Sequence, residues 1–394
     1  MLQAQFIRQL AFSLIIACGL LSGCQTVQYY SQAIYGQLDL LNRRQPVSDL
    51  IADPQTPQDL KSRLRLATEM LDFAATDLYL PVDGQYRTYV NLQRPYVIWN
   101  VFAAPEFSLD PKTWCYPIAG CTAYRGYFTE KNARRYALIL ADSGYDVMIG
   151  GVSAYSTLGW FSDPLLSTFI NSSEPRLAAL IFHELSHQAV YVRDDTVFNE
   201  SFATAVSHEG MRRWSASRGN LDNHQRYMAA YHQEQEMVAL IAAYRSRLAE
   251  LYRSQVPASA MRQLKLALLE ALRQEFESRL KEEKNLQRFA HWFDATLNNA
   301  KLISIATYHD YLPAFGQLLE TCQYDLQRFY QECRRLAVLD PAERRDAMQE
   351  LLQLSAGPPR VARDLPHPPE MVQKLHNNQN ECRTGLDGAF KTSN

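Results

Sequence analysis

Two histidines stand four positions apart near the middle of the chain, in the sequence HELSH from His183 to His187. On a helix this spacing places both imidazoles on one face, where they can bind a single metal ion. Glu184 lies next to the first histidine, within reach of a water on that metal, and can take the proton of this water. The pattern therefore predicts a hydrolytic Zn²⁺ site, with Glu184 as its general base.

The segment around this motif is strongly apolar, which strengthens the metal prediction. A helix from Glu174 to about Tyr191 is expected, capped by Ser173 and with Pro175 in its first turn. Histidine and glutamate side chains on such a buried helix cost free energy unless a partner satisfies them. A metal ion is the simplest partner for them.

A second helix is expected to supply the third protein ligand that a catalytic zinc site needs. Its early sequence, NESFA, resembles the Asn-Glu-x-x-Ala element of gluzincin peptidases, although the gap before that element is several residues longer in zinc aminopeptidases. The resemblance implies that Glu200 is the third ligand. Two alternatives stay open: His208, two helical turns further on, and the aspartates Asp194 and Asp195 in the connection between the helices.

Several further stretches resemble a family of bacterial lipoproteins that is named as an aminopeptidase family, over most of residues 25–340. They are CYPIAGCTAYRGYF from Cys115, GGVSAYSTLGWF from Gly150, the HELSHQ and NESFAT elements, and Asn298-Asn299-Ala300 with Tyr308. The resemblance implies a zinc peptidase that acts on peptides, with Tyr308 as the donor to the oxyanion and His208 in reserve. The name of that family rests on its own likeness to gluzincins.

The direction of cleavage stays open. Gluzincin aminopeptidases anchor the free amine of the substrate with a Gly-x-Met-x-Asn element, which is not visible in this sequence. Glu174 and Asp163 precede the zinc ligands, but no pattern marks either carboxylate as the partner of an ammonium group. The segment from Gly150 to Thr157 stands where gluzincins carry an edge strand that pairs with the substrate backbone. An interior strand is the alternative for this segment.

The N-terminus carries the features of an export signal. Leu10 to Leu21 form an apolar run that is too short to span a bilayer and that leads into Leu-Ser-Gly-Cys at Cys24. This ending resembles a bacterial lipobox, which implies that residues 1–23 are a signal peptide and that Cys24 carries a lipid. By the sorting rule that goes with this resemblance, Gln25 favours the outer membrane. The protein is therefore expected in the bacterial cell envelope, facing the periplasm.

Charge and cysteine content narrow the class of protein further. A net charge of −2 and a pI near 6.5 argue against a nucleic-acid partner, which would favour a basic surface. In an oxidising periplasm Cys115 and Cys121, which flank a short turn, are the best disulfide pair. Cys322 and Cys333 form a weaker pair, and Cys382 is left over.

The pattern along the chain predicts an α+β fold that is mainly α, with a gluzincin-like catalytic domain, a small β-sheet and a long helical hairpin. Helices are expected over 55–80 and Glu130–Asp142, and strands over 86–101 and 145–157. The second zinc-site helix is expected to start at a Thr196 cap and to reach about Arg213.

Two long helices follow and are separated at Pro257. Apolar residues line one face of each: Met237, Leu240, Ile241, Tyr244, Leu248 and Leu251 on the first, and Leu264, Leu268, Leu272, Phe276 and Leu280 on the second. These faces favour antiparallel packing of the two helices, and a surface for a partner helix is the alternative.

Five segments are expected: a signal peptide over 1–23, an N-terminal helical region over 24–85, the zinc-peptidase core over 86–220, a helical domain over 221–356 and a flexible tail over 357–394. A zinc aminopeptidase of the periplasm is the function that these patterns favour. The alternatives are a zinc endopeptidase, and a non-catalytic envelope lipoprotein with a structural metal site or a partner-binding hairpin.

Overall fold

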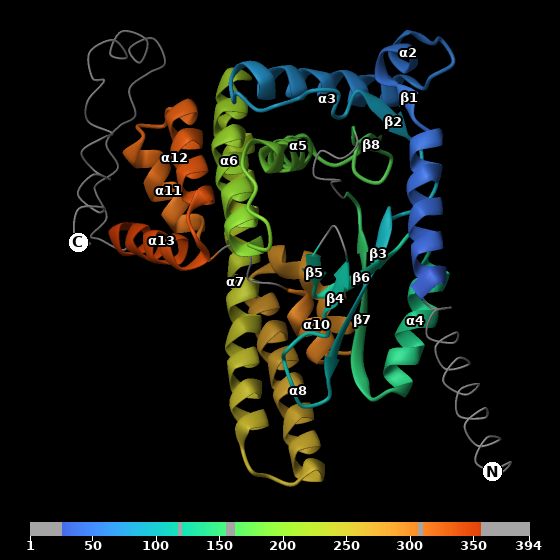
Figure 1. Ribbon diagram of the computed structural model, residues 1–394, viewed down its shortest axis with the longest axis vertical. Coiled ribbons are helices and arrows are strands. Elements are labelled where there is room, and N and C mark those ends of the chain that lie inside the picture. The colour runs from blue at the N-terminus through green and yellow to red at the C-terminus, as the bar shows by residue number, and fades with distance from the viewer. Residues whose placement is uncertain (1–25, 117–119, 155–161, 306–309, 356–394) are drawn as a thin grey trace, which may run out of the picture.

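The computed structural model describes residues 26–116, 120–154, 162–305 and 310–355. The predicted lipid-bearing Cys24, the predicted oxyanion donor Tyr308 and the predicted tail lie outside these residues. Helices dominate the described part, and small sheets complete an α+β fold that is mainly α, as the sequence predicts (Figure 1).

The secondary structure begins with a helix over residues 26–42. The helices that follow are α2 (Val47–Ala52), α3 (Gln58–Thr76), α4 (Glu130–Asp142), α5 (Glu174–Ala189), α6 (Thr196–Ser217), α7 (Leu221–Arg253), α8 (Ala258–Glu282), the short 3₁₀ helix η1 (Lys284–Leu286), α9 (Gln287–Asp294), α10 (Asn299–Ser304), α11 (Leu312–Thr321), α12 (Leu326–Val338) and α13 (Pro341–Ser355). The strands are β1 (Gln45–Pro46), β2 (Thr88–Val90), β3 (Ile98–Pro105), β4 (Trp114–Tyr116), β5 (Gly120–Thr122), β6 (Tyr124–Tyr127), β7 (Tyr145–Val152) and β8 (Leu165–Leu166).

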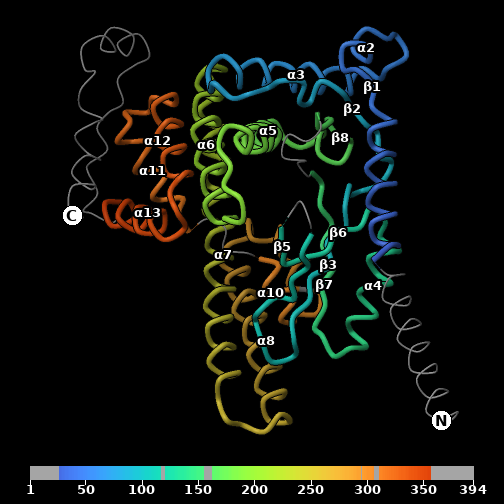
Figure 2. The backbone as a smooth tube through the Cα atoms, in the orientation of Figure 1, coloured from blue at the N-terminus to red at the C-terminus, as the bar shows by residue number. Residues whose placement is uncertain are grey.

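Helices α5 and α6 lie at the centre of the largest apolar cluster, which we call the site core. Helix α3 packs on α5, and α11 packs on α6, so the two central helices are covered from both sides (Figure 2). Phe182 of α5 and Phe198 and Phe202 of α6 are completely buried there. Removal of this much aromatic surface from water fixes the position of both helices.

The largest described sheet has the strand order β6-β3-β7 and is antiparallel throughout. Alternate residues of β3, namely Trp99, Val101 and Ala103, are buried and form a sheet core with Ala133 and Leu140 of α4. Strand β3 is thus central and β7 is an edge strand. The β4–β5 hairpin follows β3 in the chain, and a disulfide joins Cys115 to Cys121 across it, as the sequence predicts.

Helices α7 and α8 form the expected antiparallel hairpin, and α6 and α7 follow each other along the long axis of the molecule (Figure 1). Met237, Tyr244 and Leu248 of α7 pack against Leu272 and Phe276 of α8 in a separate hairpin core. The predicted break at Pro257 is confirmed, because α8 begins one residue later. None of the helices in the described residues is long and apolar enough to cross a membrane.

Two local predictions are wrong, and a third holds in part. Ser173 is the N-cap residue of α5, as predicted, but its side chain makes no capping hydrogen bond. Asp195 takes the place predicted for Thr196, because its carboxylate accepts from the Phe198 N–H. No disulfide links Cys322 to Cys333, and both are buried as thiols. Cys322 follows the end of α11 and Cys333 lies on α12, and both side chains are packed in the apolar site core.

Candidate metal centre

Helix α5 presents the two motif histidines side by side. The centroids of the His183 and His187 rings are 4.9 Å apart, and the ring planes are nearly perpendicular. The opposite face of α5 is anchored by Ile181, Phe182 and Leu185, which are completely buried in the site core. The apolar residues of this helix therefore determine which way its histidines point.

Helix α6 begins beside α5 because the connection between them is held by one side chain. Asn199 Oδ1 accepts from the Val192 N–H at 2.8 Å, and Asn199 Nδ2 donates to the Val192 carbonyl at 2.7 Å. Asp194 adopts a left-handed backbone, with φ of 62°, which reverses the chain. The connection is short, and these two features let it close without buried unpaired peptide groups.

Small residues let α5 and α6 approach each other closely. Ser207 donates to the Ala179 carbonyl at 2.9 Å, so even this polar contact joins the two helices. A Cβ atom on Gly210 would lie 2.8 Å from the Phe182 ring and 2.9 Å from Leu78. A larger residue at Gly210 would force the helices apart, and with them the groups that they carry.

Glu200 faces both histidines from the first turns of α6. Its Oε2 lies 3.1 Å from His183 Nε2, and its Oε1 lies 3.8 Å from His187 Nε2. Two ligands of one tetrahedral ion, each about 2.1 Å from it, lie about 3.4 Å apart. The observed separations bracket this value, and one ligand atom from each of the three residues lies within 4.8 Å of the others. His183, His187 and Glu200 therefore form a group that can bind a metal ion.

Burial and charge give the members of this site different proton affinities. Burial raises the pKa of Glu184 to about 7, although the charge of His183 opposes the rise. Burial also lowers the pKa of His187 to about 4, so this imidazole is neutral at pH 7 and can donate a lone pair to a metal. For His183 burial acts in the same downward direction, but the hydrogen bond to Glu200 and the charge of Glu184 outweigh it, and the pKa is raised.

The alternative ligands do not join this group. The ring of His208 packs against Tyr231, with centroids 4.4 Å apart, and the group of possible ligands in the described residues does not include it. Asp194 is exposed beside Arg193. Asp195 is engaged as the cap of α6 and in an ion pair with Arg344 at 2.8 Å.

The carboxylates of Glu174 and Asp163, which precede the candidate ligands in the chain, lie in different parts of the structure. Glu174 accepts from Trp214 Nε1 at 3.0 Å, at the far end of α6. Asp163 is buried, and its charge contributes to the raised pKa of Glu184, so it lies near that carboxyl group. Tyr86 also lies near Glu184 and Asp163. Burial raises the pKa of its phenol, and the charges of these two carboxylates raise it further. No sequence pattern marks Tyr86, since it is one of 22 tyrosines.

The resemblance had drawn attention to Asn298 and Asn299, and the structure places both in the scaffold. Asn299 Nδ2 donates to the carbonyls of Pro105, Glu106 and Ser108, and its N–H donates to Asp146. These bonds attach α10 to the end of β3.

Edge strand β7 offers peptide groups that no other described strand takes up. Val152 faces β3, because its carbonyl accepts from the Val97 N–H, so Val147, Ile149 and Gly151 point away from the sheet. Asn298 Nδ2 covers the first of these by donating to the Val147 carbonyl at 3.0 Å. Within the described residues the peptide groups of Ile149 and Gly151 have no hydrogen-bond partner, which leaves an edge that an extended peptide can join.

Asn199 is a residue whose role the sequence did not predict, and its replacement gives a direct test. Asn199→Ala would leave the N–H and carbonyl of Val192 buried without partners, so the free energy of unfolding should fall by about 2–3 kcal/mol. We expect the chain to fold and to bind metal about tenfold more weakly, because Glu200 follows directly in the chain. Urea titration and metal titration measure the two effects, with Asn223→Ala on α7 as the control. Unchanged stability would contradict this role of Asn199.

Comparison with known proteins gives one match. Residues 28–348 match the family described as "Putative aminopeptidase", and the matched part contains the whole candidate metal centre. No curated protein and no solved structure matches the chain. Since this family covers most of the sequence, the chain belongs to the "Putative aminopeptidase" family.

Proposed function

We propose that this protein is a zinc-dependent peptidase that hydrolyses peptides from their N-terminus. The observation that carries the proposal is the group of His183, His187 and Glu200, two imidazoles and one carboxylate on adjacent helices. This combination is the ligand set of catalytic zinc sites, which leave a fourth position open. A structural zinc site would close that position with a fourth protein ligand, and the described residues offer none in this group.

In this proposal different residues of the chain have different roles in peptide hydrolysis. When bound, Zn²⁺ lowers the pKa of a water and polarises the scissile carbonyl. Glu184 stays outside the ligand group, and its pKa of about 7 suits a residue that takes a proton and returns it to the leaving amine. The free peptide groups of Ile149 and Gly151 would hold the substrate backbone in an extended form.

Recognition of a free N-terminus needs a carboxylate near the scissile bond. Asp163 is the first candidate, because its charge reaches Glu184. A buried ammonium group without such a partner would be costly, so an acetylated peptide and a free peptide should differ in rate.

The test compares one peptide with a free and with an acetylated N-terminus. We expect the free peptide to be cleaved at least a hundredfold faster, as for a site built to pair with a group that the competitor lacks. Release of the first residue, followed by mass spectrometry, identifies the product. Equal cleavage of both peptides at an internal bond would make the protein an endopeptidase and would leave the zinc mechanism in place.

We also propose that a lipid on Cys24 tethers the protein to the membrane of the cell envelope. The Leu-Ser-Gly-Cys sequence after a short apolar run supports this proposal. Cys24→Ala removes the acyl acceptor, so a high-salt wash of the membrane fraction is expected to release this variant and to leave the parent chain bound. Mass spectrometry of the N-terminal peptide should show the added acyl chains, and an unmodified Cys24 in the wild-type chain would refute the anchor.

A further inference from the structure

The first described helix, over residues 26–42, has an apolar outer face. Its inner face is packed against the protein. Leu40 is buried, and a Cβ atom added to Gly36 would lie 2.1 Å from the ring of Phe128, which stands between β6 and α4. The opposite face carries exposed apolar side chains at helical spacing: Val27, Tyr30, Ile34, Tyr35 and Leu38, with 65, 38, 59, 76 and 50% of their surface exposed. A helix at the surface of a soluble domain normally turns polar residues outward. We call these five residues the apolar stripe.

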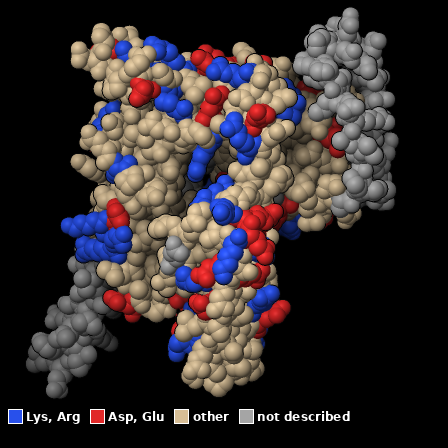
Figure 3. Space-filling model, turned by 180° about the vertical axis from the view of Figure 1, so that it is seen from behind, with Lys and Arg blue, Asp and Glu red and all other residues tan. Residues whose placement is uncertain are grey.

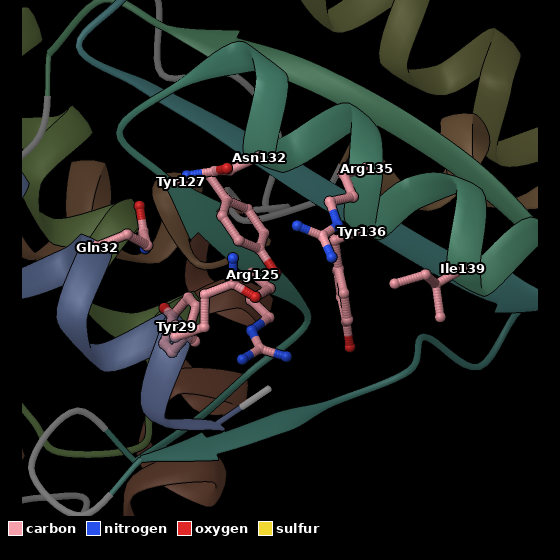
Figure 4. A pocket seen from close by; sticks show the side chains of 9 residues that line it. Tyr29, Gln32, Arg125, Tyr127, Asn132, Arg135, Tyr136 and Ile139 are labelled. Carbon is pink, nitrogen blue, oxygen red and sulfur yellow. The ribbon is translucent and has the colours of Figure 1, made fainter. Parts of the chain in front are cut away.

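A cavity of about 70 Å³ lies between this helix, strand β6 and helix α4 (Figure 4). By volume it can hold roughly five water molecules, or one small polar group. Figure 4 shows Tyr29 and Gln32 reaching it from the first helix, and Arg135 and Tyr136 from α4. Among the described residues that line it, two are arginines, Arg125 and Arg135, and none is acidic.

Arg125 is held in place by aromatic rings instead of a carboxylate. Its guanidinium carbon lies 3.9 Å from the centroid of the Tyr29 ring and 4.6 Å from that of Tyr136. Its Nε is buried without a hydrogen-bond partner in the described part of the chain. Burial raises the pKa of Tyr29 and Tyr127, so these phenols stay neutral and do not cancel the positive charge.

The surface around the cavity also carries cationic side chains without ion pairs to described carboxylates, together with exposed apolar side chains. Arg135 on α4 forms no ion pair with a described carboxylate, and Lys131, one turn earlier, forms none either. Leu138 and Ile139 on the same helix are 65 and 39% exposed. Seen from behind, Lys and Arg gather at the left edge of the molecule, at the height of α4 (Figure 3). Cationic and exposed apolar groups together are typical of elements that lie in a membrane interface.

We propose that this surface rests on an anionic phospholipid bilayer, with the apolar stripe in the interface and the phosphate of a lipid headgroup in the cavity beside Arg125 and Arg135. The position of the stripe supports this occupant, because Val27 is the third residue after Cys24. Guanidinium groups donate paired hydrogen bonds to phosphate, which supplies the charge that the cavity lacks. The choice of a bilayer as the occupant rests on the proposed lipid at Cys24, whereas binding by this surface is tested without that lipid.

Vesicle flotation tests the headgroup site. The mature chain with Cys24→Ser is expected to float with phosphatidylcholine vesicles that contain phosphatidylglycerol, and not with phosphatidylcholine alone. Arg135→Gln should lower the partition coefficient about fivefold, the effect of one basic residue at an anionic surface. Arg253→Gln, at the exposed end of α7, is the matched control and should bind like the parent chain.

A second pair of variants tests the apolar stripe. Ile34→Ser combined with Tyr35→Ser should lower partitioning at least tenfold, since two large side chains no longer enter the interface. Val338→Ser on α12, where the side chain is 84% exposed, should have no effect. All these positions are exposed, so the variants should keep the melting temperature of the parent chain.

Three results would overturn the proposal. Equal partitioning to both kinds of vesicle, unchanged by Arg135→Gln, would remove the headgroup site. Displacement from vesicles by inorganic phosphate, but not by sodium chloride of equal ionic strength, together with calorimetric binding of phosphate alone, would make the cavity a free-anion site. A dimer that forms without vesicles and dissociates in the Ile34→Ser, Tyr35→Ser chain would assign the stripe to a second copy of the protein.

Discussion

Replacing Glu184 by glutamine is expected to lower kcat about a thousandfold while the bound zinc stays at the wild-type level. Glutamine has the same shape but cannot accept a proton, and general-base catalysis typically contributes 10²–10⁴-fold. Metal binding should be unaffected because Glu184 lies outside the group formed by His183, His187 and Glu200. The measurements are the rate of peptide cleavage under substrate saturation and the zinc content by mass spectrometry.

Glu236→Gln is the control for this substitution, because it makes the same chemical change on an exposed position of α7. It should leave both the rate and the zinc content unchanged. Loss of zinc from Glu184→Gln would show that the carboxylate binds the metal, and a rate close to wild type would show that another group takes the proton.

Removing the carboxylate of Glu200 should weaken metal binding far more than the Glu184→Gln substitution does. Glu200→Ala takes away one of the three proposed ligands, so we expect the zinc affinity to fall more than a hundredfold. Loss of a residue that only hydrogen-bonds to a ligand typically costs about 10–100-fold in affinity. Activity should fall with it, and added zinc should restore part of the activity. Competition with a chelator of known affinity gives the dissociation constant.

His208→Ala separates this assignment from its main rival. The ring of His208 packs between the rings of Tyr227 and Tyr231 and lies outside the metal-binding group, so the variant should keep its zinc. If His208→Ala loses zinc and Glu200→Ala keeps it, the third ligand is His208.

Elements with strong local signals could be predicted from the sequence. Helix α4 has the predicted bounds, Glu130–Asp142, because Thr129 caps its first turn and Gly144, with φ of 83°, ends the turn that follows it. The hairpin helices separate at Pro257 as expected, since proline is tolerated before a helix but not inside one. In these cases neighbours in the chain decide the structure.

The sequence predicts less well which side chains are buried where contacts with residues far away in the chain determine burial. Leu264 was predicted on the buried face of α8 and is 46% exposed, whereas Lys265 is buried. Lys265 Nζ donates to Asp146 of β7 at 2.6 Å and to the Glu106 carbonyl, so a contact with the sheet selects which face of α8 is covered. Hydrophobic periodicity cannot show such a contact, because it counts lysine as an outward residue.

The same distinction applies to the candidate metal centre. The spacing of His183 and His187 is local, and the sequence could predict that both histidines share one face of a helix. The place of Glu200 depends on how α6 turns back, and that turn depends on the bonds from Asn199 to Val192. Resemblance to gluzincins pointed to the glutamate, but only the fold shows how a connection this short reaches the histidines.

The division of the apolar interior into a site core, a hairpin core and a sheet core has a consequence for how this protein melts. The three clusters have no buried residue in common, but Lys265 and Asn299 join the hairpin to the sheet. We therefore expect unfolding in more than one cooperative step, with the hairpin core and the sheet core melting together. A ligand stabilises only the unit that binds it. Zinc should therefore raise the melting transition of α5 and α6 and leave that of the α7–α8 hairpin where it was, so a single melting temperature would not describe the molecule.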